Sequence, residues 1–184
     1  MAQFNGYIQV PHDSYDLWRT ATLGNGFNVD YAYDNQCWDL PALLYFQYGL
    51  RLITRPQGNG TAAMCWTVSR AANSVPPFIS IADATQIKRG DIIVWSDNQY
   101  SSTGHIAFAD EDYNGTNNIS CLGQNQGQGT SGPANIATLT LDNFLGFFRN
   151  TNWTSPDPEP EPETENKRKF PWAIAWAHWD NFKN

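Results

Sequence analysis

The chain has 184 residues, of which 41% are hydrophobic and 14% aromatic, so it can bury the core of one domain but leaves no room for a second full one. Its formal net charge is −7, and non-specific binding to nucleic acid, which needs a positive surface, is not expected. No run approaches the roughly 18 apolar residues of a membrane span, and the first residues lack the basic and apolar regions of an export signal.

Two helices are predicted in the first half of the chain. After Cys37, apolar residues recur at helical spacing as far as Gly49, a plausible stop. Pro41 fits only in a first helical turn, so this helix should begin at or just after Cys37. Residues 61–73 are predicted to form a second helix.

Strand-like runs follow the prolines at positions 76 and 77. They are residues 91–96, 105–110, 118–123, 136–141 and 144–149. Helices followed by an antiparallel meander indicate an α+β fold, with N-terminal helices packed on an antiparallel sheet.

The composition changes after residue 150, where we expect the domain 1–150 to end. Residues 151–169 contain alternating Pro and Glu, which favour an extended linker. Residues 170–184 include three Trp and two Phe, too few to form a core and too many for a solvated tail. This segment is expected to dock on the domain or on a partner.

Cys37 lies where a nucleophilic thiol is favoured, because the N-terminus of a helix lowers the pKa of a nearby thiol. Its neighbours are polar, which suits a cleft. Cys65 and Cys121 are expected to be buried small hydrophobic residues. The three cysteines are far apart and form no CxxC pair, so neither a disulfide framework nor a zinc site is indicated.

A thiol nucleophile also needs a base, normally a histidine held by a third polar group. His105 begins one predicted strand and Asn125 follows the next. Adjacent antiparallel strands would bring both to one end of the sheet, where they could form a triad with Cys37. His12 and His178 are expected to be structural.

These segments resemble the CHAP family, the cysteine, histidine-dependent amidohydrolases and peptidases. NQCWDL at 35–40 is similar to the family's nucleophile motif, IKRGDIIVWSDN at 87–98 to its Gly-Asp strand entry, and TGHIAFADE at 103–111 to its histidine strand. CLGQNQ at 121–126 is a weaker match, because family members often have an acidic residue where this chain has Gly123. Either Asn125 orients His105 or another residue does. The resemblance spans roughly residues 10–150.

The resemblance implies a papain-like CHAP fold and hydrolysis of an amide or peptide bond in bacterial peptidoglycan through an acyl-enzyme. Without an export signal, the protein would be a bacteriophage endolysin or virion-associated lysin, made in the host cytoplasm and acting on the host cell wall. The Cys37 N–H would form half of the oxyanion hole, with Gln36 a candidate for the other donor. Four aromatic residues could line a substrate groove or pack elsewhere: Trp38, Trp66, Trp95 and Tyr100.

Two other functions remain open. One is a catalytically inactive CHAP-like module for wall binding or virion architecture. The other is a cysteine hydrolase that acts on a small soluble amide. With either an active or an inactive domain, residues 170–184 could contact virion proteins.

The segment around the nucleophile also predicts a calcium site. Ca²⁺ takes about 6–8 oxygen ligands, and some CHAP enzymes carry a calcium loop at this place. The candidate ligands are the side chains of Asn28, Asp30, Asp34 and Asp39 and the carbonyl of Ala32. The alternative is that these are ordinary loop residues and that Asp39 caps the helix.

Overall fold

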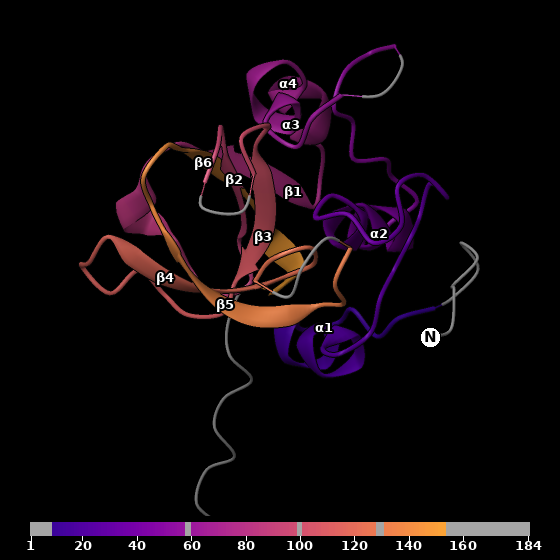
Figure 1. Cartoon of the computed structure of the whole chain (residues 1–184), viewed down its shortest axis with the longest axis horizontal. Coiled ribbons are helices and arrows are strands. Elements are labelled where there is room, and N and C mark those ends of the chain that lie inside the picture. Colours follow the sequence, from indigo (N-terminus) through magenta and orange to yellow (C-terminus); the bar gives the residue numbers. More distant parts are fainter. Residues whose placement is uncertain (1–8, 58–59, 99–100, 128–130, 154–184) are drawn as a thin grey trace, which may run out of the picture. The chain divides into compact units, whose positions relative to one another are not determined.

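The structure, a computed structural model, describes residues 9–57, 60–98, 101–127 and 131–153. Some predicted features lie outside these residues: positions 154–169 of the linker, the segment 170–184 with His178, and Tyr100. Figure 1 shows N-terminal helices and one antiparallel sheet, which confirms the predicted α+β class. No helix in the described ranges is long and apolar enough to cross a membrane.

The helices are α1 (Tyr15–Thr22), α2 (Asp39–Gln47), α3 (Met64–Thr67) and α4 (Arg70–Asn73). α2 confirms the helix predicted to begin just after Cys37. α1 was not predicted, although Ser14 caps it by accepting a hydrogen bond from the N–H of Leu17. The cap residue is therefore the local signal that could have revealed this helix.

The single helix predicted for residues 61–73 is wrong, because α3 and α4 are separate short helices. The N–H of Ser69 bonds to the carbonyl of Met64, five residues back, so the helical hydrogen-bond ladder ends there. The Ser69 hydroxyl donates to the carbonyl of Thr54, which lies on another segment. Tertiary bonding thus overrides the local helical pattern.

The sheet contains β1 (Phe78–Ile81), β2 (Ile92–Trp95), β3 (His105–Ala109), β4 (Asn118–Gly123), β5 (Asn135–Thr140) and β6 (Phe144–Asn150). Its strand order is β1-β6-β2-β3-β4-β5, all antiparallel. All five predicted strands are present, and the short strand β1 was missed. Only β2 to β5 form the predicted meander, since β6 returns to lie between β1 and β2.

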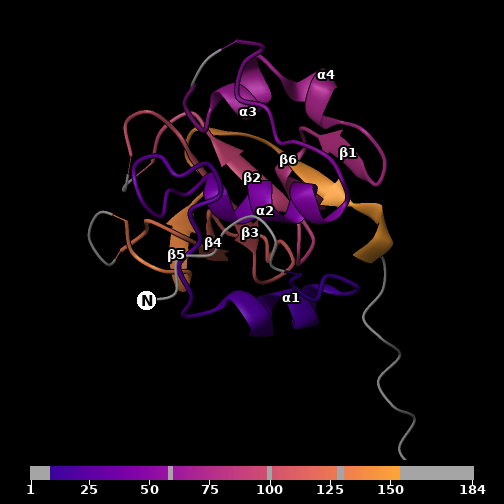
Figure 2. The same ribbon diagram turned by 90° about the vertical axis from the view of Figure 1, so that its right-hand side faces the viewer.

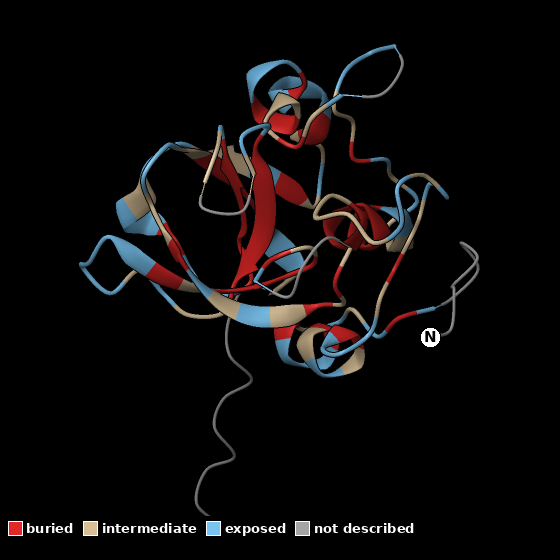
Figure 3. Cartoon of the chain, viewed as in Figure 1, coloured by how far each residue is buried: buried red, intermediate tan, exposed pale blue. Residues whose placement is uncertain are grey.

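The sheet is strongly curved. The indole Nε1 of Trp95 in β2 donates to the carbonyl of Thr140 in β5 at 2.9 Å, although two strands separate β2 and β5 in the sheet order. An apolar cluster that includes Ile93, Ala107 and Leu139 fills the inside of this curve, separate from the main core described below. β2 and β3 are consequently buried on both faces (Figure 3).

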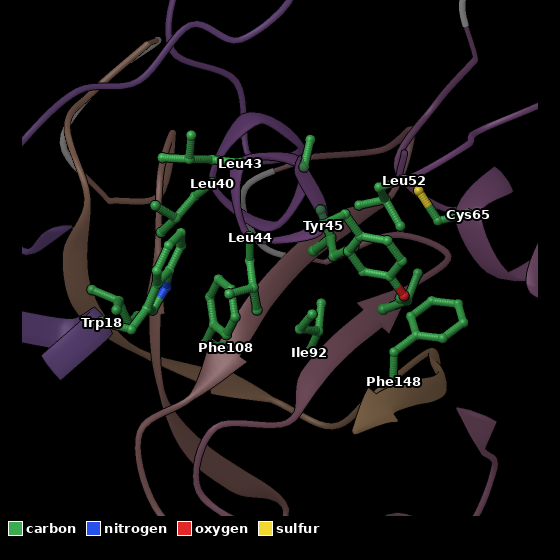
Figure 4. Packing of buried hydrophobic residues seen from close by; sticks show 14 of the residues in the cluster. Trp18, Leu40, Leu43, Leu44, Tyr45, Leu52, Cys65, Ile92, Phe108 and Phe148 are labelled. Atoms are coloured by element: carbon green, nitrogen blue, oxygen red, sulfur yellow. The ribbon is translucent and has the colours of Figure 1, made fainter. Parts of the chain in front are cut away.

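The main core lies between α2 and the sheet. Figure 4 shows Leu40, Leu44 and Tyr45 of α2 meeting apolar side chains of the strands, among them Phe108 and Phe148. In Figure 2, α2 lies across the sheet, with α1 below it and α3 and α4 above. Because this packing fixes α2 on β3, it also fixes the segment before α2, which carries Cys37, near the start of β3.

An ion pair secures the entry to β2. Asp91, 2% exposed, accepts two hydrogen bonds from Arg149 of β6, from Nε at 2.9 Å and from Nη2 at 2.7 Å. Gly90 has a φ of +92°, a left-handed conformation that favours glycine. The Gly-Asp motif therefore has a structural role here: it turns the chain into β2 and joins that strand to β6.

The domain extends beyond its predicted end at residue 150. Thr151–Trp153 forms a 3-10 helix, and the indole Nε1 of Trp153 donates to the carbonyl of His12 at 2.7 Å. The Trp153 ring packs against Tyr15 and Trp18 of α1. Residues 151–153, assigned to the linker from composition, thus belong to the domain because this tryptophan covers α1.

Candidate active site

A cleft of about 530 Å³ opens where the segment before α2 meets the start of β3. Residues between Asp30 and Asp39 form one wall, and residues 51–56 with 60–62 line another. Residues between Ser101 and His105, together with Asn125, complete the lining. Cys37 and His105, chosen from the sequence as nucleophile and base, thus line one cleft.

Cys37 lies two residues before α2 and keeps partial exposure to the cleft. Burial among protein atoms raises the pKa of its thiol to about 11 and outweighs nearby backbone N–H groups, chiefly that of Ile106, the residue after His105. The expectation of a lowered thiol pKa is therefore wrong. Helix position favours the thiolate, but the desolvation cost is larger, so the resting thiol is protonated at neutral pH.

His105 is 1% exposed, and its Nε2 lies 2.9 Å from Oε1 of Gln126. Burial lowers the pKa of His105 to about 4, partly opposed by the hydrogen bond with Gln126. Both His105 and Cys37 are therefore neutral at pH 7. The raised pKa of Cys37 and the lowered pKa of His105 favour a histidine that takes the thiol proton during attack over a preformed ion pair.

Among the described residues, Gln126 is seen to hydrogen-bond to the His105 ring, whereas the sequence had suggested Asn125. Asn125 lies one residue earlier with a φ of +54°, and its Oδ1 accepts from the N–H of Ser131 at 2.9 Å. Its Nδ2 donates to Oε1 of Gln36 at 3.2 Å. Asn125 lines the cleft and ties two loops together, while Gln126 makes the hydrogen bond with Nε2 of His105.

Gln36 has both ends of its side chain engaged in the cleft wall. Its Nε2 donates to the carbonyl of Tyr33 and lies 3.5 Å from Oγ of Ser131. Its Oε1 accepts from Asn125. The role of Gln36 as a hydrogen-bond donor in an oxyanion hole stays a prediction.

The predicted calcium ligands do not form a cage in this structure. Asp39 accepts from the N–H of Val29 with Oδ1 at 2.8 Å and from the N–H of Gln36 with Oδ2 at 2.7 Å, so it caps the loop. Asp30 accepts from the N–H of Ala32 at 2.9 Å. Within the described ranges, no three His, Cys, Asp or Glu side chains are grouped to hold a metal.

One atom of this segment still has spare capacity for a ligand. Oδ1 of Asn28 is buried and has no hydrogen-bond partner among the described residues. Asp34, another predicted ligand, has a φ of +59° in an exposed stretch. Burial raises the pKa of Asp39 to about 7, against the N–H groups of Val29 and Gln36, so its charge varies near neutral pH. These residues do not fit the ion as they stand, and calcium binding stays a prediction.

The aromatic candidates divide between cleft and core. Trp38 lines the cleft, but Trp66 packs on Phe148 at a ring distance of 5.4 Å, and Trp95 is fully buried. Core packing therefore explains these last two. Tyr33, which was not among the aromatic residues predicted to line a groove, is 77% exposed and lines the cleft. No local pattern marks Tyr33, because its exposure depends on the left-handed loop around it, where its φ is +59°.

Two arginines on the cleft, Arg51 and Arg55, were also missed. Asn73 anchors their segment: its Nδ2 donates to the carbonyl of Ile53 and its Oδ1 accepts from the Ile53 N–H, both at 2.8 Å. Four other cations form salt bridges with aspartates: Arg19, Lys88, Arg89 and Arg149. In the part of the chain that the structure describes, Arg51 and Arg55 form none. The cleft lining therefore carries two arginines outside these salt bridges, together with two acidic residues, Asp30 and Asp39.

The remaining cysteines and His12 are structural, as predicted. Cys65 and Cys121 are free and fully buried. Nδ1 of His12 lies 3.0 Å from the carbonyl of Val10, and its ring packs edge-on against Tyr48.

Comparisons with known proteins identify the family and agree with this fold. The family model described as CHAP domain matches residues 26–125. The crystal structure of a wild type endolysin, LysIME-EF1, has a TM-score of 0.58 and 23% identity, covering 75% of this chain and 64% of that one. The crystal structure of Ly7917 has a TM-score of 0.52 and 14% identity, covering 78% and 63%. The chain thus spans less than two thirds of both structures. No curated protein matches it.

Proposed function

The chain belongs to the CHAP family, and on this premise we propose that it hydrolyses an amide or peptide bond of bacterial peptidoglycan, with Cys37 as nucleophile and His105 as base. The observation that carries the proposal is the meeting of these two residues on one cleft, with the Cys37 thiol beside the N–H of Ile106. A neutral thiol and a neutral imidazole on one cleft suit nucleophilic catalysis in which proton transfer accompanies attack.

The reaction proceeds in two stages. His105 takes the proton of the Cys37 thiol as sulfur attacks the substrate carbonyl, and the resulting oxyanion accepts a hydrogen bond from the Cys37 N–H. His105 then gives the proton to the leaving amine, and an acyl-enzyme remains. Water, deprotonated by His105, attacks this thioester; the acid product leaves, and the thiol regains its proton.

Two arginines of the cleft lining support a peptide with carboxylate groups as the substrate class. Arg51 and Arg55 line the cleft, and among the described residues neither forms a salt bridge, in contrast to Arg19 and Arg149. Stem peptides of the wall carry carboxylates, and guanidinium groups bind carboxylates through paired hydrogen bonds. We assign the arginines to the peptide part of the substrate.

The likeness to the endolysin LysIME-EF1 supports a bacteriophage lysin that acts on the host cell wall. Since the chain spans less than two thirds of that structure, the biological setting rests on fold similarity alone. The proposal covers two settings, an endolysin and a virion component. In the second, residues 170–184 would contact virion proteins.

Mass spectrometry of purified sacculi after digestion tests the function and identifies the bond. New amino termini within the stem peptide or cross-bridge would indicate an endopeptidase, and a new N-terminal alanine freed from muramic acid would indicate an amidase. Turnover of small amides without any change in sacculi would favour a small-amide hydrolase. Sacculi and small amides both left intact would favour an inactive wall-binding or structural module.

A further inference from the structure

We propose that Gln126 is the positioning residue of this site, and that its amide group fixes which ring nitrogen of His105 carries the proton. The proposal rests on the proposed function, which it deepens. Gln126 is fully buried and makes three polar contacts. Its Oε1 lies 2.9 Å from Nε2 of His105, and its Nε2 donates to the carbonyls of Cys121 and Asn135, both at 3.0 Å.

The two carbonyl contacts settle the orientation of the amide. A carbonyl oxygen can only accept, so the NH₂ group of Gln126 must face Cys121 and Asn135. The amide oxygen then faces His105, and Nε2 of His105 must be the donor of that hydrogen bond. In the neutral ring the lone pair is therefore on Nδ1, which is the nitrogen that would take the thiol proton.

The opposite tautomer is disfavoured by the same contacts. With the proton on Nδ1, Nε2 of His105 and Oε1 of Gln126 would be two acceptors facing each other in a buried site. Rotating the amide to relieve this contact would turn its oxygen towards the carbonyls of Cys121 and Asn135. The tautomer with a proton on Nε2 satisfies all three of these contacts of Gln126.

Gly123 provides the space that Gln126 uses. A Cβ atom at position 123 would lie 2.7 Å from Oε1 of Gln126 and 2.9 Å from Cβ of Ala107. A side chain at position 123 and the side chain of Gln126 therefore compete for one volume. Gly123 is also the position where members of the CHAP family often have an acidic residue. In this chain, Gly123 and Gln126 together form an alternative to that arrangement.

The contacts also require an amide in place of a carboxylate. In Gln126→Glu, a carboxylate oxygen would face the carbonyls of Cys121 and Asn135, which are acceptors already. The orienting group is consequently neutral, and it adds no negative charge beside the buried His105. This agrees with the neutral state of the histidine in the site.

The test compares wild type with Gln126→Met, which keeps the length of the side chain and removes its polar groups. Hydrolysis of purified peptidoglycan should fall 10- to 100-fold in kcat with little change in KM. Nitrogen NMR of histidine-labelled protein should show the proton of His105 on Nε2 in wild type and distributed over both nitrogens in Gln126→Met. His105→Gln identifies the His105 signals, and Gln86→Met, at an exposed glutamine, is the matched control.

A second variant keeps the proposal testable if Gln126→Met does not fold. Gly123→Ala leaves Gln126 in the chain but places a methyl group against its Oε1, so kcat should fall and the proton on Nε2 should be lost in part. Wild-type kcat and an unchanged Nε2 proton in either folded variant would overturn the proposal. The NMR result needs no substrate, so it stands or fails separately from peptidoglycan hydrolysis.

Discussion

Nε2 of Gln124 donates to the carbonyl oxygen of Gln36, the residue before the nucleophile, at 3.0 Å. Gln124 is fully buried and also exchanges two hydrogen bonds with the backbone of Phe27, at 2.7 Å and 3.0 Å. It thus joins the end of β4 to both ends of the loop that leads to Cys37. Three consecutive residues therefore organise the site: Gln124 holds this loop, Asn125 holds the Gln36 side chain, and Gln126 contacts His105.

Gln124→Leu should lower both stability and activity. The variant keeps a similar volume but leaves backbone groups of Phe27 and Gln36 without their partner, at a cost of about 2–3 kcal/mol in the free energy of unfolding. Because the nucleophile loop loosens, kcat should fall more than KM changes. Urea unfolding and peptidoglycan hydrolysis measure the two effects, with Gln86→Leu as the exposed control. Wild-type values for Gln124→Leu would show that the loop is held elsewhere.

The sequence predicted the parts of the site that local pattern encodes. Cys37 precedes a helix with a first-turn proline, and His105 begins an apolar strand, so both could be located from neighbouring residues. Gln126 could not be chosen over Asn125, because the choice depends on Gly123 and on carbonyls of two strands.

Long-range features of the fold and site were predicted least well. The return of β6 between β1 and β2 is fixed by pairing between strands far apart in the chain. Arg51 and Arg55 reach the cleft because Asn73, about twenty residues away, anchors their segment. The sign of the Cys37 pKa shift was missed for the same reason, since burial by distant segments outweighs the local helix. Each of these three errors concerns contacts between segments far apart in the chain, which a short stretch of sequence does not contain.

Stability should fall as pH decreases from about 6.5 to 4, because of His105. Its pKa is about 4 in the folded protein against 6.5 for the ordinary residue, so over this range only the unfolded chain takes up the proton. The loss is up to about 3 kcal/mol at the acid end. Urea unfolding at pH 7 and pH 4.5 should therefore show a larger difference for wild type than for His105→Gln. An equal difference in both proteins would mean that His105 is not held neutral by burial.

Arg51→Gln and Arg55→Gln combined should raise KM for wall peptides about tenfold, equal to about 1.4 kcal/mol of binding, while kcat changes little. The effect should shrink at high salt, since exposed charges are screened. Arg70→Gln is the matched control, because Arg70 is exposed and lies over the Trp66 ring, away from the cleft lining. An unchanged KM, or an equal rise of KM in the control variant, would show that these arginines do not bind the substrate.

Calcium binding is tested by calorimetry and by thermal unfolding in EGTA. If the loop from Asn28 to Asp39 rearranges to bind Ca²⁺, chelation should lower the melting temperature, and calcium should restore it better than magnesium. Asp30→Asn with Asp34→Asn should abolish the response, and Asp83→Asn, an exposed aspartate elsewhere, should not. No heat of binding and an unchanged melting temperature would leave Asp39 as a cap of the loop, which is the role its hydrogen bonds support.

The central claim is that Cys37 is the nucleophile, and the most direct measurement is the release of new termini from purified peptidoglycan by single cysteine variants. Cys37→Ala should abolish release while its melting temperature stays near that of wild type, since the residue lines a cleft. Cys65→Ala and Cys121→Ala remove buried side chains and should lose stability but keep turnover in the folded fraction. Undiminished release by folded Cys37→Ala would contradict the account.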